Sequence, residues 1–291
     1  MRQFEYLQPT TVRQAVNLLQ QYGDRARVAA GNTDLLIRIK RGVDKPACLI
    51  GLGRIQGLEG ITIDASGTLR LGAMATMRMI ERSPIIRQGW MAVAEAASVL
   101  GSVQIRNLAT IGGNICNASP SADTVPALVA LGAQVLLVGP TGSRTVPLYE
   151  FFRGPGLTLL RPAELLVEVQ VPPLPAHAGC AYARYALRAG PDCALVGVAA
   201  YIECSPRSNL CQGARLVLGA VAPTVIRAPR AEAVLADQDP KTDHVLREVA
   251  AVAEQEARPI SDVRASAEYR RRLVRILTSQ AITEAARRIV I

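Results

Sequence analysis

The chain is organised around the stretch Thr110-Ile111-Gly112-Gly113-Asn114-Ile115-Cys116-Asn117-Ala118-Ser119-Pro120-Ser121-Ala122-Asp123. Two adjacent glycines follow an apolar run, and small polar residues then lead to an aspartate and a helical pattern. Glycines let a backbone approach a flat or phosphorylated ligand, and hydroxyl and amide groups bind phosphate and ribose oxygens. A plain turn has the same composition. Alone, the stretch leaves both interpretations equally open.

The totals indicate a multidomain globular protein. The chain has 291 residues, which predicts two or three domains, and its 49% apolar and 20% charged residues are typical of soluble proteins. It has no apolar run of about 18 residues that would span a membrane. The N-terminus lacks the apolar core of a signal peptide, so we expect a cytoplasmic protein.

The net charge of +9 raises the question of nucleic-acid binding. Much of the excess lies in one arginine-rich stretch between Arg264 and Arg288. With three Phe and one Trp there is little for bases to stack on. A solvated helix face or an acidic partner is therefore favoured, and no nucleic acid is expected.

The cysteines and histidines indicate no metal or hydrolytic centre in this chain. None of the six cysteines forms a C-x-x-C pair, so scattered reduced thiols are expected. His177 and His244 lie near no recognisable catalytic triad. We therefore predict no catalytic and no metal-binding residue here.

Residues 1–55 predict a small α/β unit. Thr10 or Thr11 caps a helix through Tyr22 that Gly23 closes. A strand then leads into the turn Gly31-Asn32-Thr33-Asp34 and an apolar segment, and residues 47–52 form a second strand. Gly51 to Gly57 resembles a dinucleotide fingerprint, but its third glycine is one residue late and no helix follows, so a Rossmann site is rejected.

Residues 56–175 predict a second α/β unit, and residues 176–291 a C-terminal α+β domain after the linker Pro172–Pro175. In the second unit we expect a hairpin of 61–64 with 68–74, helices at 76–82, 90–100, 124–131 and 149–152, and strands at 135–138, 144–148 and 165–171. In the last domain we expect strands at 182–187, 194–203 and 214–221, then helices at 228–236, 244–257 and 266–289.

Two loops of similar chemistry are the strongest ligand candidates. Ala30–Asp34 and Thr110–Asn114 both follow apolar runs and contain Gly, Asn and Thr. A dinucleotide pyrophosphate carries two negative charges and needs several converging N–H donors. Two loops from two units can supply these donors from both sides without a Rossmann motif.

These motifs carry a resemblance to a known family. Ala-Gly-Asn-Thr-Asp-Leu-Leu at 30–36, Gln-Ile-Arg-Asn-Leu-Ala-Thr-Ile-Gly-Gly-Asn from 104, and Tyr-Ala-Arg-Tyr-Ala-Leu-Arg from 182 resemble the FAD-binding medium subunit of the molybdenum hydroxylases. Xanthine dehydrogenase and aerobic carbon monoxide dehydrogenase belong to this family. The resemblance implies an α+β fold: a two-subdomain FAD-binding region of the vanillyl-alcohol-oxidase type, then a domain with a three-stranded antiparallel sheet and helices.

The resemblance also implies cofactor-binding residues. Arg27 to Leu35 contact the FAD diphosphate and adjacent groups, Asp123 the ribose or pyrophosphate side, Leu165 or Leu166 the adenine end, and Arg184 lies near the flavin. The complete set is Arg27, Val28, Ala29, Ala30, Gly31, Asn32, Thr33, Asp34, Leu35, Leu100, Thr110, Ile111, Gly112, Gly113, Asn114, Asn117, Asp123, Leu165, Leu166 and Arg184.

Several of these residues also fit structural roles. Asp34 and Asp123 fit turn or cap positions, and Arg184 fits a strand surface. Leu100 and Leu166 fit the core, and Asn117 can simply shape its loop. Leu100 departs from the aromatic residue that packs on the flavin in some members, and an aliphatic side chain cannot stack in the same way.

The resemblance further implies an oxidoreductase complex. A large subunit carries the molybdenum cofactor and a small subunit two 2Fe-2S clusters, and this FAD subunit passes electrons to NAD⁺, a quinone or O₂ without touching the organic substrate. A dimer of heterotrimers, a heterohexamer, is implied. The alternatives are a stand-alone flavin oxidoreductase, for which Cys116 offers a covalent attachment point, and a non-enzymatic basic scaffold protein.

Overall fold

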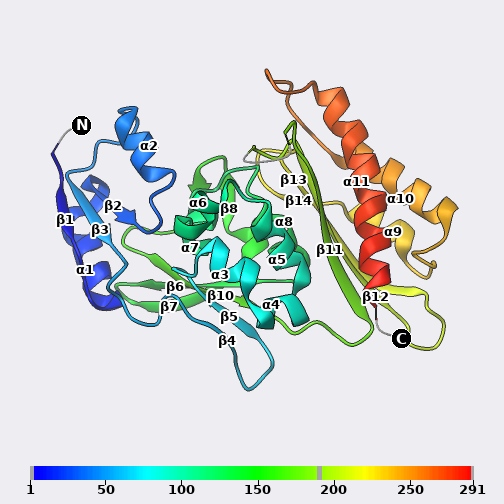
Figure 1. Cartoon of the computed structure of the whole chain (residues 1–291), viewed down its shortest axis with the longest axis horizontal. Coiled ribbons are helices and arrows are strands. Elements are labelled where there is room, and N and C mark those ends of the chain that lie inside the picture. Colours follow the sequence, from blue (N-terminus) through cyan, green and yellow to red (C-terminus); the bar gives the residue numbers. More distant parts are fainter. Residues whose placement is uncertain (1–2, 189–191, 290–291) are drawn as a thin grey trace.

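The structure is a computed structural model that describes residues 3–188 and 192–289. Within these residues the strands form sheets of three, five and four strands and one two-stranded hairpin. Figure 1 shows the three sheets in sequence order across the molecule, with helices α3 to α8 between the second and third sheets and α9 to α11 on the outer face of the third.

The first sheet is parallel, and β3 lies between β1 and β2. Thr11 caps the helix that follows β1 by accepting a hydrogen bond from the Gln14 N–H at 3.2 Å, and Gly23 ends that helix at a φ of 52°. Both terminus predictions are confirmed. The elements are β1 (Glu5–Leu7), α1 (Val12–Tyr22), η1 (Gly23–Arg25), β2 (Ala26–Ala29), α2 (Leu35–Lys40) and β3 (Cys48–Gly51).

The second sheet is antiparallel, in the order β4-β5-β10-β6-β7. The predicted 61–74 hairpin is present as β4 and β5, and Thr76 caps α3 as expected. No helix lies between β3 and β4 in these fully described residues, as the rejection of a Rossmann site requires. The strands are β4 (Ile61–Ile63), β5 (Leu69–Gly72), β6 (Gln134–Gly139), β7 (Gly142–Pro147), β8 (Phe152–Gly154), β9 (Leu157–Thr158) and β10 (Leu165–Val171).

The helices of this unit differ most from the sequence-based expectation. The double-glycine stretch, predicted as a loop or turn, begins with a helix, and the preceding segment, predicted as a connection, forms another. Side-chain caps make these short helices possible: Ser102 accepts from the Ile105 N–H and Thr110 from the Gly113 N–H. The elements are α3 (Met77–Arg82), α4 (Pro84–Gly89), α5 (Met91–Ser98), α6 (Val103–Leu108), α7 (Ile111–Cys116), α8 (Thr124–Ala130) and η2 (Leu148–Glu150).

The third sheet is the predicted antiparallel meander, extended by one short strand at its edge. Its two faces alternate: Cys180 and Tyr182 face the core of the second unit, whereas Ala181 and Ala183 face the C-terminal helices. The elements are β11 (Ala178–Tyr185), β12 (Val196–Cys204), β13 (Cys211–Gly219), β14 (Ile226–Arg227), α9 (Pro229–Leu235), α10 (Asp243–Glu256) and α11 (Ala267–Arg287).

This arrangement confirms the predicted α+β fold class. The division at residues 55 and 175 stays a prediction, because the core of the first sheet also contains Leu165 and Val167 from β10. The third sheet packs against α5 and α8 through β11, β12 and β13. Side chains of β11 are therefore brought to the edge of the second unit, where the site lies.

Candidate functional site

The loop after β2 presents a row of free hydrogen-bond donors. Among the described residues, none accepts a hydrogen bond from the backbone N–H groups of Gly31, Asn32, Thr33 or Asp34. Asn32 adopts a φ of 61°, which is the left-handed conformation that turns successive N–H groups into a concave anion-binding nest. Its side-chain Nδ2 donates to the Ala30 carbonyl, and its Oδ1 is buried without a partner. An anion with a nearby hydroxyl donor fits this loop.

The same loop touches the junction between α6 and α7. A Cβ added to Gly31 would lie 2.0 Å from the carbonyl oxygen of Leu108 and 3.0 Å from Cα of Ala109. Only glycine permits this backbone contact. The two stretches singled out from the sequence are therefore adjacent in space.

The two glycines of α7 differ: Gly112 is occupied by contacts within the chain, whereas Gly113 is not. The Gly112 N–H donates to the Ala73 carbonyl, and a Cβ on Gly112 would lie 2.8 Å from Ala73. A Cβ on Gly113 would meet only the Thr110 hydroxyl, at 3.0 Å. Gly112 is thus required for packing, and Gly113 keeps the outer side of the helix open. The free backbone donors come from the first loop, which sequence reasoning did not distinguish.

The polar side chains of this stretch lie at its outer side. Asn114 Oδ1 accepts a hydrogen bond from the Thr124 hydroxyl at 2.7 Å, which ties α7 to α8. Asn114 and Asn117 are half-buried, and Ile111 is fully buried. The Cys116 thiol has its pKa raised to about 12 by burial, so it stays protonated and does not favour covalent attachment.

A cavity of about 630 Å³ lies farther along α6, where the α5–α6 turn meets β11. Val99, Gly101 and Arg106 line one side, and Tyr182 and Arg184 from the C-terminal sheet line the other. This volume lies in the range of small-molecule and cofactor pockets. A planar ring system fits here, and Leu100 sits in the same turn, half-buried against the core.

Asp123, Tyr182 and Arg184 form a buried cluster beside this cavity. Asp123 Oδ1 accepts a hydrogen bond from the Tyr182 hydroxyl at 2.9 Å and lies 2.9 Å from Arg184 Nε. Asp123 makes no side-chain hydrogen bond that caps α8, so the cap interpretation is wrong. Arg184 is 11% exposed, which excludes a strand-surface role.

The electrostatics of the cluster follow from burial. Removal from water raises the pKa of the Asp123 carboxyl to about 6, although the Arg184 charge and the Tyr182 hydrogen bond act in the opposite direction. Burial and the neighbouring Asp123 carboxylate raise the pKa of Tyr182 well above its usual value. Tyr182 therefore acts as a hydrogen-bond donor.

The remaining expected site residues differ in exposure, from the exposed Arg27 to the buried Leu165 and Leu166. Arg27 contacts Asp44 and the carbonyls of Asp24 and Ala26, near the start of β2. Leu165 and Leu166 are 4% and 2% exposed, so little of their surface is left for a ligand. Val28, Ala30 and Leu35 are half-buried around the loop, and Ala29 is buried.

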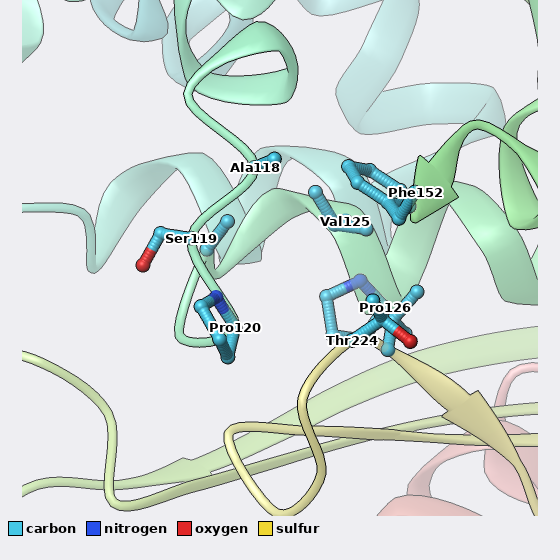
Figure 2. Close-up of a pocket in the computed structure, with 9 residues that line it drawn as sticks. Ala118, Ser119, Pro120, Val125, Pro126, Phe152 and Thr224 are labelled. Atoms are coloured by element: carbon cyan, nitrogen blue, oxygen red, sulfur yellow. The ribbon is translucent and has the colours of Figure 1, made fainter. Parts of the chain in front are cut away.

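A second, much smaller cavity lies behind the residues after α7. Figure 2 shows Val125, Pro126 and Phe152 around it, with Thr224 from the connection between β13 and β14. Its volume of about 10 Å³ holds at most one water molecule. It is a packing gap between the units and not a cofactor site.

Sequence reasoning missed Arg106 and Tyr182. Arg106 is the one buried side chain of α6, and its guanidinium reaches Glu81 and two carbonyls of the α5–α6 turn. Tyr182 precedes Arg184 by two residues, so both point to one face of β11. The alternation of side chains along this strand was the sequence signal that could have placed Tyr182 beside Arg184.

Two other kinds of feature, metal sites and membrane-spanning helices, are absent from residues 3–188 and 192–289. These residues contain no cluster of three or more His, Cys, Asp and Glu side chains arranged to hold a metal ion. In the same residues, no helix has the length and apolar character needed to cross a membrane.

Family models match almost the whole chain. Residues 2–174 match the FAD binding domain in molybdopterin dehydrogenase, and residues 181–285 match the CO dehydrogenase flavoprotein C-terminal domain. Among characterised sequences, a putative xanthine dehydrogenase FAD-binding subunit of Escherichia coli K12 is 35% identical over 96% of this chain and 95% of that protein. The carbon monoxide dehydrogenase medium chain of Hydrogenophaga pseudoflava is 34% identical over 97% and 96%.

Solved structures agree with these matches. A chain of the carbon monoxide dehydrogenase from Hydrogenophaga pseudoflava superposes with a TM-score of 0.94 at 35% identity, covering 99% of both chains. A chain of quinoline 2-oxidoreductase from Pseudomonas putida 86 superposes with a TM-score of 0.91 at 28% identity, covering 98% of both.

Proposed function

Because this chain belongs to the family of FAD-binding subunits of the molybdenum hydroxylases, we propose that it passes electrons from the 2Fe-2S clusters of a partner subunit to NAD⁺, a quinone or O₂. The family is one of oxidoreductases, and this chain contains its FAD-binding domain. Bound FAD supplies the redox chemistry, and the protein binds and orients it. Residues 3–188 and 192–289 hold no cluster of metal ligands, so in this proposal the organic substrate is bound and hydroxylated on a partner subunit.

The FAD diphosphate is assigned to the loop after β2. The free N–H groups of Gly31 to Asp34 give four donors to an anion, and Asn32 Oδ1 accepts from a neighbouring hydroxyl group. Gly113 keeps the facing side of α7 open, and Asn114 lies beside it. Thr110 supports this stretch by capping α7.

The flavin end is assigned to the cavity of about 630 Å³. Val99 and Gly101 line it from the α5–α6 turn, which also holds Leu100, and Arg184 supplies a fixed positive charge. We find no hydrogen bond to Asp123 Oδ2 in the described residues, so this oxygen is available to a cofactor hydroxyl. Leu165 and Leu166 contribute through packing rather than through exposed surface.

The remaining assignments extend the family relationship. The partners are a large molybdenum-cofactor subunit and a small 2Fe-2S subunit, in a dimer of heterotrimers. Six free thiols and no disulfide in the described chain fit a reducing, cytoplasmic compartment. Of the arginines of α11, Arg270 is buried, and Arg272 and Arg287 pair with Glu268 and Glu284 of the same helix, which gives no support to the scaffold alternative.

The observation that carries the proposal is the contact of Gly31 with the α6–α7 junction, which places a row of free donors beside the open side of α7. The full chain is purified, its visible flavin absorbance is recorded, and acid-released cofactor is identified by chromatography. We expect a yellow protein that releases intact FAD. A colourless protein that takes up no added FAD contradicts the proposal.

A variant pair locates the binding loop. Gly113→Val fills the open side of α7, and Thr110→Ala removes the cap without filling it. We expect Gly113→Val to lose FAD and Thr110→Ala to retain most of it, with both proteins folded by circular dichroism. Equal loss in both variants would show that the cap, rather than close approach to Gly113, controls binding.

A further inference from the structure

Two buried arginines hold the same turn from opposite sides. Arg106 Nη1 donates to the carbonyls of Leu100 and Gly101, at 3.1 Å each. Arg184 Nη1 donates to the carbonyl of Val99 at 3.2 Å. Three successive carbonyls are therefore fixed by two guanidinium groups, and two of the three residues, Val99 and Gly101, line the large cavity. Planar guanidinium donors hold such a geometry more rigidly than an ammonium group can.

Each arginine is fixed in turn by a carboxylate. Arg106 Nε lies 3.0 Å from Glu81 on α3, so its anchor belongs to the second unit. Arg184 lies on β11, and its anchor Asp123 lies at the start of α8. The Arg184 contact therefore joins the C-terminal sheet to the FAD-binding region across the cavity.

Tyr182 completes the second anchor. Its hydroxyl donates to Asp123 Oδ1, the same oxygen that faces Arg184 Nε. The tyrosine ring is seated over Gly197 of β12, where a Cβ would lie 2.5 Å from the Tyr182 hydroxyl oxygen. The backbone of the third sheet thus fixes the hydroxyl, and the hydroxyl fixes the carboxylate.

We propose that Asp123 and Tyr182 are positioning residues: through Arg184 they hold the Val99–Gly101 turn in place as the wall of the flavin cavity. The proposal deepens the FAD-binding function and rests on it for the identity of the ligand. It assigns the C-terminal sheet a direct part in shaping the cofactor site. It also gives one Asp123 oxygen a role that does not require contact with the cofactor.

The first test uses the cofactor-free full chain. Hydrogen–deuterium exchange of the backbone amides between Val99 and Ser102 is compared in the parent, Tyr182→Phe and Asp123→Asn. Loss of one hydrogen bond to a charged group corresponds to about tenfold in an equilibrium. We therefore expect local exchange to accelerate by about tenfold in Tyr182→Phe and by more in Asp123→Asn.

The second test uses FAD. The dissociation constant of FAD is measured by quenching of flavin fluorescence, and the visible circular dichroism of the bound flavin reports its surroundings. For Tyr182→Phe we expect about tenfold weaker binding and an altered flavin spectrum. Tyr201→Phe is the matched control, because Tyr201 is a buried tyrosine of the same sheet whose hydroxyl donates to Glu203 at 2.7 Å, away from the cavity.

The outcomes separate this proposal from the proposed function. Unchanged exchange at Val99–Ser102 in both variants overturns the positioning role, whether or not the protein binds FAD. Accelerated exchange with unchanged FAD affinity and spectrum overturns the link to the flavin cavity. If Tyr201→Phe changes the exchange rates and the FAD affinity as much as Tyr182→Phe does, the effect is general destabilisation, and the positioning role is overturned as well. If the parent protein binds no FAD, the proposed function is wrong, but the exchange data still test whether Asp123 and Tyr182 hold the turn in place.

Discussion

Replacing Gly31 by alanine tests the contact between the loop after β2 and the α6–α7 junction, which we propose to bind FAD together. The new Cβ would lie 2.0 Å from the Leu108 carbonyl oxygen and 2.8 Å from the Leu108 carbonyl carbon. Both are backbone atoms, so no side chain can swing away. Gly31 has no positive φ, so the effect is steric and not a matter of backbone conformation.

The magnitude follows from this distance. An ordinary carbon–oxygen contact requires the loop and the α6–α7 junction to separate by more than about 1 Å. Overpacking of this kind costs about 1–3 kcal/mol in the free energy of unfolding. A shift of this size also takes at least one loop N–H out of hydrogen-bond reach of an anion. Since such a charge-assisted bond is worth about 1.5–3 kcal/mol, the FAD dissociation constant should rise at least tenfold.

The assay combines urea unfolding with FAD titration of the folded protein. Gly179→Ala is the matched control, because its Cβ would lie 1.9 Å from the Ala285 carbonyl oxygen, where β11 meets α11. We expect a similar loss of stability in both variants but weaker FAD binding only in Gly31→Ala. Gly89→Ala, whose Cβ meets nothing within 4 Å, should change neither quantity.

Three results would refute the reasoning. Parental stability of Gly31→Ala would show that the loop does not touch Leu108. Parental FAD affinity in a destabilised Gly31→Ala would show that the loop is not the anion site. Equal losses of FAD affinity in Gly31→Ala and Gly179→Ala would assign the effect to general destabilisation.

Three further predictions concern stability. Burial raises the pKa of Asp123 to about 6, so between pH 4 and 6 the folded state binds a proton that the unfolded state has lost. The free energy of unfolding should therefore fall as pH rises through this range, by up to about 3 kcal/mol. In urea unfolding, the stability difference between the parent and Asp123→Asn should change with pH in this way, and a pH-independent difference would contradict the prediction. Thr110→Ala removes the cap of α7 and should cost about 1 kcal/mol in thermal unfolding, with Thr110→Ser close to the parent. Arg270 is 2% exposed and donates to the Leu195 carbonyl and Asp262, so Arg270→Ala should cost about 3–5 kcal/mol in urea unfolding, and a loss below about 1 kcal/mol would contradict its anchoring role.

Much of the fold could be predicted from the sequence because its signals are local. Thr11, Thr76 and Ser266 cap helices at the expected positions, each by accepting an N–H three residues on. The 61–74 hairpin and the three long strands of the last sheet follow from alternation and turn residues. The family and its FAD cofactor could be inferred from short motifs, because a motif is recognised by residue types at set positions in the sequence.

The short helices were harder to predict from the sequence, because contacts with distant residues stabilise them. The six residues of α7 include two glycines, which disfavour a helix. The helix forms because Thr110 caps it and because Gly112 packs on Ala73, which is distant in sequence. Composition therefore indicated a loop where tertiary contact produces a helix.

By itself the sequence determined the family and the cofactor, and it singled out the two stretches that we propose to bind FAD, because these depend on residue types at short spacing. Only the tertiary structure decided the roles within the site. It assigned Gly112 to packing, placed the free donors at Gly31–Asp34, and paired Asp123 with Tyr182 and Arg184. Those partners lie about sixty residues apart in sequence, and their meeting depends on the docking of the third sheet against α8, which no local pattern encodes.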